Sequence, residues 1–192
     1  MNPDRRVFLE MSGGLTVMLV LGGIGRATMS KDILRPPGGQ DELNFISKCI
    51  KCDRCRSICP TSVIGAVHAD ESFLDARTPV MKYHIGYCDF CGKCVEVCPT
   101  DALRPFERKS AKIGLAVVTD RCIAWNSGGC TVCGNQCPEK AIAFDALKRP
   151  VVNSEKCNGC GLCEKICPAL VLRSYEGGTL RGIQVRPARR MC

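Results

Sequence analysis

Short stretches of apolar, β-favouring residues recur along this chain and are separated by polar residues, glycine and proline. Four of these stretches follow Cys-Pro pairs, and each is typical of a turn that leads into a strand. The recurrence predicts a repeated unit of strand, loop, short helix and strand, so we expect an α+β fold. The stretches lie at 61–64, 100–103, 115–118, 139–142, 150–152 and 169–172.

The amino terminus has a different pattern, in which Arg5 and Arg6 precede a weakly apolar, glycine-rich stretch at 11–25. This order is typical of a twin-arginine export signal. A short buried helix or a membrane span is the alternative, but a span needs roughly twenty apolar residues and glycine weakens a helix. We therefore expect a signal segment at 1–27 and a periplasmic protein, with Gly25 and Ala27 at cleavage positions. An uncleaved segment would act as a weak membrane anchor.

Sixteen of the seventeen cysteines fall into four runs, and a proline follows the last cysteine of each run. Runs 1, 2 and 4 share the spacing Cys-x2-Cys-x2-Cys-x3-Cys-Pro, the ligand spacing of bacterial 4Fe-4S ferredoxins. In run 3, seven residues separate the first two cysteines. The runs are Cys49, Cys52, Cys55 and Cys59 (run 1); Cys88, Cys91, Cys94 and Cys98 (run 2); Cys122, Cys130, Cys133 and Cys137 (run 3); and Cys157, Cys160, Cys163 and Cys167 (run 4).

Cysteines at every third position can place three thiolates on three corners of a cubane cluster. In two-cluster ferredoxins the fourth ligand is the last cysteine of the partner run. Pairing run 1 with run 2 and run 3 with run 4 predicts four 4Fe-4S clusters, whose iron is bound by four ligand sets. These are Cys49, Cys52, Cys55 and Cys98 (set 1); Cys88, Cys91, Cys94 and Cys59 (set 2); Cys122, Cys130, Cys133 and Cys167 (set 3); and Cys157, Cys160, Cys163 and Cys137 (set 4).

Three alternatives to this assignment remain open. A nested pairing would join run 1 with run 4 and run 2 with run 3. Zinc also suits paired Cys-x2-Cys units, although a zinc ribbon needs neither the third cysteine nor the trailing Cys-Pro. Disulfides are common in exported proteins, but a disulfide framework does not require the same spacing to recur along the chain.

The composition favours small modules built around inorganic cores, because aromatic residues make up only 5% of the 192 residues. We predict two tandem bacterial-ferredoxin-like modules with two 4Fe-4S clusters each, after the N-terminal signal segment. The divisions are the signal segment at 1–27, a linker at 28–45, module 1 at 46–108, module 2 at 109–175 and a basic C-terminal tail at 176–192.

The net charge of +8 would by itself suggest a nucleic-acid or membrane partner. An oxidised cubane cluster with four thiolates carries about two negative charges, so four clusters bring the holoprotein close to neutrality. We therefore expect no nucleic-acid partner. Arg186, Arg189 and Arg190 form either a docking patch or part of a solvated terminus.

The two histidines, the last cysteine and the one tryptophan are not expected to bind a cluster. His68 and His84 are expected to be ordinary surface or packing residues, because every predicted cluster already has four thiolates. Cys192 has no partner among the runs and is expected to be a free thiol. Trp125, in the insertion of run 3, is expected to pack against the protein, the alternatives being a shield for a cluster or a contact for a redox partner.

Taken together, the twin-arginine leader, the linker at 36–39 and four Cys-Pro runs with a stretched third run resemble the NapG/MauM ferredoxin-type family. The resemblance implies an exported protein with four clusters that relays electrons. The donor would be a membrane quinol-oxidising iron-sulfur partner, and the acceptor a periplasmic cytochrome or reductase.

No catalytic residues are expected, because one-electron transfer needs no acid, base or nucleophile and the cofactor supplies the chemistry. The chain is then an electron-transfer subunit with no turnover of its own. One alternative is an electron-transfer subunit of a larger molybdenum enzyme, hydrogenase or reductase complex. Another is a cysteine-rich interaction or maturation protein that binds zinc.

Overall fold

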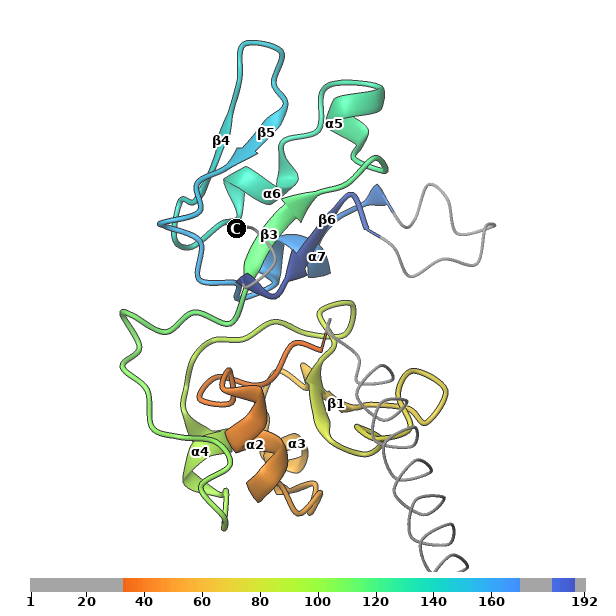
Figure 1. The fold of residues 1–192 in the computed structure, drawn as a ribbon. Helices are drawn as coiled ribbons and strands as arrows, with labels where there is room; N and C mark the ends of the chain where they lie inside the picture. The colour runs from red at the N-terminus through yellow and green to blue at the C-terminus, as the bar shows by residue number, and fades with distance from the viewer. Residues whose placement is uncertain (1–32, 170–180, 189–192) are drawn as a thin grey trace, which may run out of the picture. The chain divides into compact units, whose positions relative to one another are not determined.

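The computed structural model describes residues 33–169 and 181–188. The predicted signal segment, most of the stretch at 169–172, Arg189, Arg190 and Cys192 lie outside the described residues. Short helices and strands alternate along the described chain, as expected for an α+β fold (Figure 1). In order they are α2 (Glu42–Lys48), α3 (Arg54–Ser57), β1 (Ile64–Ala66), β2 (Pro79–Met81), α4 (Lys93–Glu96), β3 (Leu115–Val118), α5 (Ile123–Asn126), α6 (Val132–Asn135), β4 (Ile142–Phe144), β5 (Pro150–Val152), α7 (Leu162–Lys165) and β6 (Ile183–Arg186).

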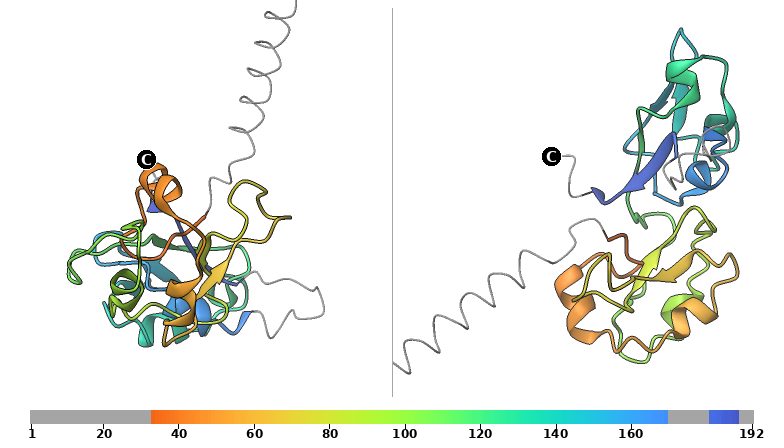
Figure 2. Two further views of the ribbon diagram at one scale, coloured as in Figure 1. Left: turned by 90° about the horizontal axis from the view of Figure 1, so that it is seen from below. Right: turned by 90° about the vertical axis from the view of Figure 1, so that its right-hand side faces the viewer.

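The described strands form three antiparallel pairs, and Figure 2 shows the strands as short arrows. In the β1–β2 pair Gly65 lies opposite Val80, and in the β4–β5 pair Ala143 lies opposite Val151. Strand β6 pairs with β3 across a long separation in sequence. With so little sheet, the loops that carry the cysteines account for much of the fold.

The strands predicted at 115–118 and 150–152 are confirmed as β3 and β5. The stretches at 61–64 and 139–142 do lead into strands, β1 and β4. Strand β6 was not expected, because residues 183–186 fall within the predicted C-terminal tail. Its partner β3 lies far away in sequence, so no local pattern signals the pairing.

The stretch at 100–103 does not form a strand, so this expectation was wrong. Asp101 has a φ of 52°, a left-handed conformation that interrupts extended backbone. Ala102 and Leu103 are nevertheless buried, and the Arg104 N–H donates to the Gly38 carbonyl at 3.1 Å. The apolar side chains therefore fill the core without a strand partner.

Two buried clusters of side chains form the cores, and both include cysteines. The first contains Phe45, Tyr83 and Leu103 together with Cys88 and Cys94. The second contains Leu115 and Ile183 together with three cysteines, Cys133, Cys157 and Cys163. The sulfur-bearing side chains are thus part of the packing rather than additions to a separate core.

Residues 67–77 form a loop between β1 and β2 that bonds to itself. The Arg77 N–H donates to the Val67 carbonyl at 2.9 Å, and the Ser72 hydroxyl donates to Asp75 at 2.8 Å. None of the helices in the described part of the chain has the length and apolar character to cross a bilayer.

Candidate iron-sulfur sites

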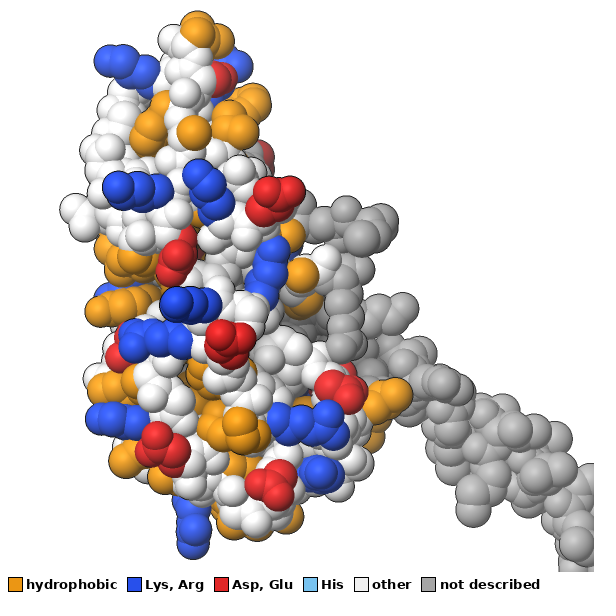
Figure 3. Space-filling view, turned by 90° about the vertical axis from the view of Figure 1, so that its left-hand side faces the viewer, with side chains coloured by type: hydrophobic (Ala, Val, Ile, Leu, Met, Phe, Trp, Pro, Cys, Tyr) orange, Lys and Arg blue, Asp and Glu red, His pale blue; other side chains and the backbone are white. Residues whose placement is uncertain are grey.

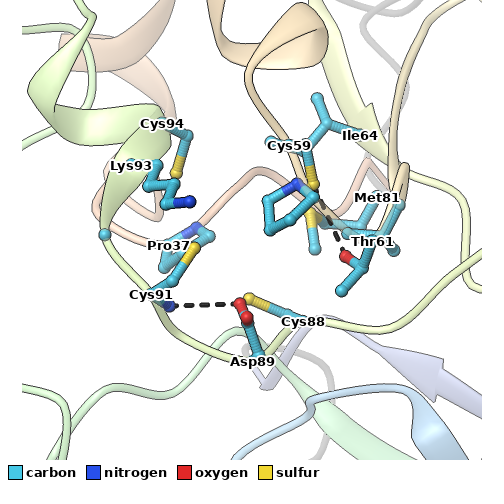
Figure 4. Close-up of a pocket in the computed structure, with 13 residues that line it drawn as sticks. Pro37, Cys59, Thr61, Ile64, Met81, Cys88, Asp89, Cys91, Lys93 and Cys94 are labelled. Atoms are coloured by element: carbon cyan, nitrogen blue, oxygen red, sulfur yellow. Dashed lines mark hydrogen bonds between the residues drawn. The ribbon is translucent and has the colours of Figure 1, made fainter.

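The four cysteines of set 2 line one open hollow of about 320 Å³. Figure 4 shows Cys88, Cys91 and Cys94 of run 2 and Cys59 of run 1 at four points around it, with Pro37, Ile64 and Met81 among the other side chains at its wall. The hollow therefore brings together three consecutive cysteines of one run and the last cysteine of another. This is the arrangement that the adjacent pairing requires of set 2.

A second open hollow, of about 330 Å³, has the same arrangement in the other half of the chain. Cys157, Cys160 and Cys163 line it together with Cys137, which are the four members of set 4. Its wall includes Ile142 at the start of β4. The two hollows thus have corresponding walls, in which strand residues face a three-cysteine loop.

Set 3 is also brought together, as its electrostatic interactions show. The pKa of Cys133 rises to about 11, chiefly through burial and in part through like-charge repulsion from Cys122, Cys130 and Cys167. The stretched spacing of run 3 therefore does not keep Cys122 away from the other members.

In set 1, the pKa of Cys55 rises to about 12, chiefly through burial, with like-charge repulsion from Cys94 and smaller contributions from Cys49 and Cys52. Cys98, the fourth member, packs against the first core together with Cys49 and Cys55. Burial raises the pKa of Cys98, but amide hydrogen bonds, led by that of Leu103, lower it below the ordinary value.

The loops curve around the hollows because the second cysteine of runs 1, 2 and 4 lies between two residues with positive φ. Glycine takes this conformation at little cost, whereas other residues rarely adopt it. The only such residues in run 3 precede the second cysteine, where the insertion ends in Gly128 and Gly129. The positive-φ residues on either side of the second cysteine are Lys51 and Asp53 in run 1, Phe90 and Gly92 in run 2, and Gly159 and Gly161 in run 4.

Backbone amides of the loops and of strand β3 point at the sulfur atoms. The Phe90 N–H donates to the Cys88 Sγ at 3.4 Å, the Ala116 N–H to Cys157 at 3.5 Å, and the Ala141 N–H to Cys137 at 3.4 Å. Such hydrogen bonds stabilise thiolates and are one means by which proteins set cluster potentials. The donors are therefore placed where thiolate ligands need them.

Burial and like-charge repulsion raise the pKa of seven of the sixteen thiols in the sets and so disfavour their charged form. The pKa of Cys88 rises to about 12 and that of Cys94 to about 11, with burial as the main cause in each case. Burial also raises the pKa of Cys163 far above its ordinary value. Thiols packed in this way need a cationic partner to ionise, and metal binding deprotonates a coordinating thiol. The donor set therefore fits iron in a cluster.

Sequence reasoning missed two threonines next to the last cysteines of runs 1 and 2. The Thr61 hydroxyl lies 3.5 Å from the Cys59 Sγ, and the Thr100 hydroxyl lies 3.9 Å from the Cys98 Sγ. The signal was present, because Cys-Pro-Thr occurs in both runs. Each hydroxyl therefore makes a polar contact with the cysteine that its run contributes to the neighbouring set, Cys59 to set 2 and Cys98 to set 1.

All sixteen cysteines of the runs are free in the structure, without disulfides among them. In the ranges that the structure describes, no three cysteine, histidine, aspartate or glutamate side chains converge as a single-ion site would require. His68 and His84 are exposed. The assignment of each of the sixteen cysteines as a cluster ligand stays a prediction.

The insertion in run 3 forms helix α5 rather than an irregular bulge. The Asn126 side-chain amide donates to the Cys122 carbonyl at 2.9 Å, so the turn is closed on the first cysteine. Trp125 is half exposed, and the Arg149 guanidinium lies 4.9 Å from its ring centre. The ring thus packs on one side against an arginine and meets solvent on the other.

On the face drawn in Figure 3, lysine and arginine side chains alternate with aspartate and glutamate side chains. Apolar side chains lie between them. This face therefore carries mixed charge rather than a field of one sign.

Comparison with known proteins assigns two parts of the chain to iron-sulfur families. Residues 48–102 match the 4Fe-4S dicluster domain, and residues 150–173 match the 4Fe-4S binding domain. The first match covers runs 1 and 2, and the second covers run 4. Both halves of the chain therefore contain ferredoxin-type 4Fe-4S sequence.

Full-length relatives support the same assignment. The chain is 32% identical to the methylamine utilization ferredoxin-type protein MauM of Methylophilus methylotrophus, over 85% of this chain and 79% of that protein. It is 34% identical to the ferredoxin-type protein NapG of Escherichia coli, over 85% of this chain and 80% of that protein. Identity to the ferredoxin-type protein NapF of Escherichia coli is 29%, over 75% and 85% of the two chains.

These matches cover most of the chain and agree with the grouping of its cysteines in space. The chain belongs to the NapG/MauM family of ferredoxin-type proteins and is an iron-sulfur electron-transfer protein.

Proposed function

We propose that this protein relays electrons through four 4Fe-4S clusters, one bound by each of sets 1 to 4. The observation that carries this proposal is the pair of hollows, each lined by three cysteines of one run and the last cysteine of its neighbour. A nested pairing would require run 1 to meet run 4 and run 2 to meet run 3. The grouping of the thiols supports the adjacent pairing.

Each bound cluster would supply one-electron redox chemistry. The residues of this chain bind it, orient it and limit its contact with water. Cys59 and Cys137 tie each hollow to the neighbouring run, and apolar side chains such as Ile64, Met81 and Ile142 line the walls. Amides directed at sulfur favour the thiolate form.

We infer that the donor is a membrane quinol-oxidising iron-sulfur protein and that the acceptor is a periplasmic cytochrome or reductase. Membership of the NapG/MauM family supports this pathway. Export by the twin-arginine route is supported by Arg5 and Arg6 and by the need to carry a folded protein whose clusters are already inserted. A retained signal segment would keep the protein at the membrane.

Iron counting on anaerobically isolated protein tests the number of clusters. We expect about sixteen iron atoms per chain and broad visible absorbance that reducing agents bleach. Cys59→Ala should lower the content by about four iron atoms, whereas Cys192→Ala, outside the four runs, should lower it by none. Iron content that is unaffected by Cys59→Ala would contradict set 2.

The export route has its own test. Replacing Arg5 and Arg6 together by lysine should leave the full-length protein in the cytoplasm, as fractionation would show. Arg26→Lys, in the same segment but away from the pair, should be exported as efficiently as the wild type. Equal export of the double variant would rule out the twin-arginine route.

A further inference from the structure

The loops of run 2 and run 4 meet directly, although the two runs belong to different predicted modules. The Cys88 N–H donates to the Cys160 carbonyl at 2.8 Å. Nearby, the Ile113 N–H donates to the Asn158 carbonyl at 2.9 Å. Backbone bonds therefore join a member of set 2 to a member of set 4.

Tyr83 lies at the same junction. Its ring is buried, with 2% of the residue exposed, and its hydroxyl donates to the Gly159 carbonyl at 2.7 Å. A Cβ atom at Gly161 would lie 1.8 Å from the Tyr83 Cδ1, so only glycine leaves room for the ring. Tyr83 therefore contacts both residues that flank Cys160, Gly159 through its hydroxyl and Gly161 through its ring.

Within each half of the chain, the two sets are also neighbours. Helix α3 of run 1 contacts helix α4 of run 2, and Cys59 of run 1 lines the hollow of set 2. Helix α6 of run 3 likewise contacts helix α7 of run 4, and Cys137 of run 3 lines the hollow of set 4. Set 2 therefore has set 1 as a neighbour within its own half, and set 4 has set 3. Sets 2 and 4 are neighbours of each other across the junction.

We propose that electrons cross between the two halves from set 2 to set 4, so that the spatial order of the sets is 1, 2, 4, 3 rather than their order along the chain. This inference rests on the proposed four-cluster function. One electron leaves the reduced iron of one set and reduces the oxidised iron of the other. No bond is broken and no proton needs to move.

Tyr83 and Gly161 serve as positioning residues for this crossing. The close contact between the ring and the glycine backbone, together with the hydroxyl bond to Gly159, fixes the run 4 loop against Tyr83. The bond between Cys88 and Cys160 then keeps the two loops within one hydrogen bond of each other. The order makes sets 1 and 3 the two ends at which external partners exchange electrons.

Two matched double variants test the order. Cys52→Ala with Cys130→Ala leaves sets 2 and 4 complete, whereas Cys91→Ala with Cys130→Ala leaves sets 1 and 4 complete. Cys52 and Cys91 are equivalent, since both are exposed second cysteines of their runs. Each full-length variant is isolated anaerobically, and its iron is counted, with about eight atoms per chain expected.

The EPR spectrum of each fully reduced variant then reports magnetic interaction between the two remaining clusters. We expect splitting from interacting spins in the variant with sets 2 and 4, and its loss in the variant with sets 1 and 4. Splitting in the second variant alone, or equally in both, would overturn the order. Variants without iron would instead contradict the proposed ligand sets, and iron counting would show this first.

The junction residues are tested in the variant that keeps sets 2 and 4. Adding Gly161→Ala should abolish the splitting, because the new Cβ displaces the Tyr83 ring. Gly128→Ala is the control, since Gly128 also has a positive φ, of 76°, but has no atom within 4 Å of the added Cβ. Tyr83→Phe, which removes only the hydroxyl bond, should weaken the splitting. Undiminished splitting in both junction variants would show that they do not position the crossing.

Discussion

At the scale of single residues, a buried arginine anchors the segment before run 1. The Arg35 side chain is 1% exposed and lies over the Phe45 ring, with 4.7 Å from its guanidinium to the ring centre. It donates to Glu42 at 3.0 Å and to the Thr78 hydroxyl at 2.6 Å. A buried charge with this many partners stabilises only while every partner is present.

Replacing this arginine should therefore be costly. We expect Arg35→Ala to lower the free energy of unfolding by about 3 kcal/mol or more, because Glu42 and Thr78 lose their donor. Anaerobic denaturant unfolding of the holoprotein measures the change. Arg56→Ala is the control, because its bond to Asp53 is exposed and should contribute no more than about 1 kcal/mol. Equal costs for the two variants would refute this account.

The sequence does not signal the burial of Arg35, which falls in the predicted linker. Its partners Thr78 and Pro79 lie 43 and 44 residues further along the chain, so their approach depends on the fold. The cysteines differ in this respect. Their spacing is a local property of the sequence, and with the adjacent pairing it is enough to predict the members that line both hollows.

At the scale of elements, strand β6 completes the second half of the chain. Ile183 is 2% exposed and Val185 is 6% exposed, and both belong to a strand paired with β3. The Val185 N–H also donates to a carboxylate oxygen of Glu164, in α7, at 2.7 Å. The strand thus links a sheet partner to the helix of run 4.

Two truncated chains distinguish the contribution of β6 to stability from that of the residues that follow it. A chain that ends at Gly182 should lose about 3 kcal/mol or more of unfolding free energy, because two buried apolar side chains and the β3 pairing are removed. A chain that ends at Ala188 keeps β6 and is the control. Unfolding of the two holoproteins should therefore differ, and identical midpoints would mean that β6 contributes no stability.

Glu164 provides a second prediction for this element. Glu164→Ala leaves the Val185 N–H without its carboxylate acceptor and should cost about 1 to 3 kcal/mol. Glu164→Gln keeps an acceptor oxygen at the same place, so most of that stability should be retained. The comparison is made by thermal unfolding under anaerobic conditions. A loss as large in the Gln variant would indicate that the charge, not the hydrogen bond, is what matters.

At the scale of the whole molecule, stability should depend on iron. Both cores include cysteines, and the strands form only short pairs. Small domains of this kind derive much of their folding free energy from metal binding. The repelling thiols of the sets would also remain without a cationic partner once iron is removed.

Chelation of the iron should therefore unfold the protein. We expect the far-ultraviolet circular dichroism signal to fall and limited proteolysis to cut within both halves, with iron and sulfide restoring the original pattern. Mock treatment without chelator provides the control. Iron-free protein that keeps the dichroism and protease resistance of the holoprotein would contradict this expectation.

The sequence by itself determined the cofactor class, the grouping of cysteines into runs and the strands β1, β3, β4 and β5 beside them. These features depend on spacing over a few residues, and cysteines at every third position suit a cubane cluster in any module of this kind.

The tertiary structure alone decided which distant groups meet. The pairing of β3 with β6, the anchor at Arg35 and the junction of Cys88 with Cys160 all join residues far apart in sequence. Such contacts depend on shape, as in the space that Gly161 leaves for the Tyr83 ring. The pattern of residues along the chain does not predict this space, because the space forms only when the two loops pack against each other.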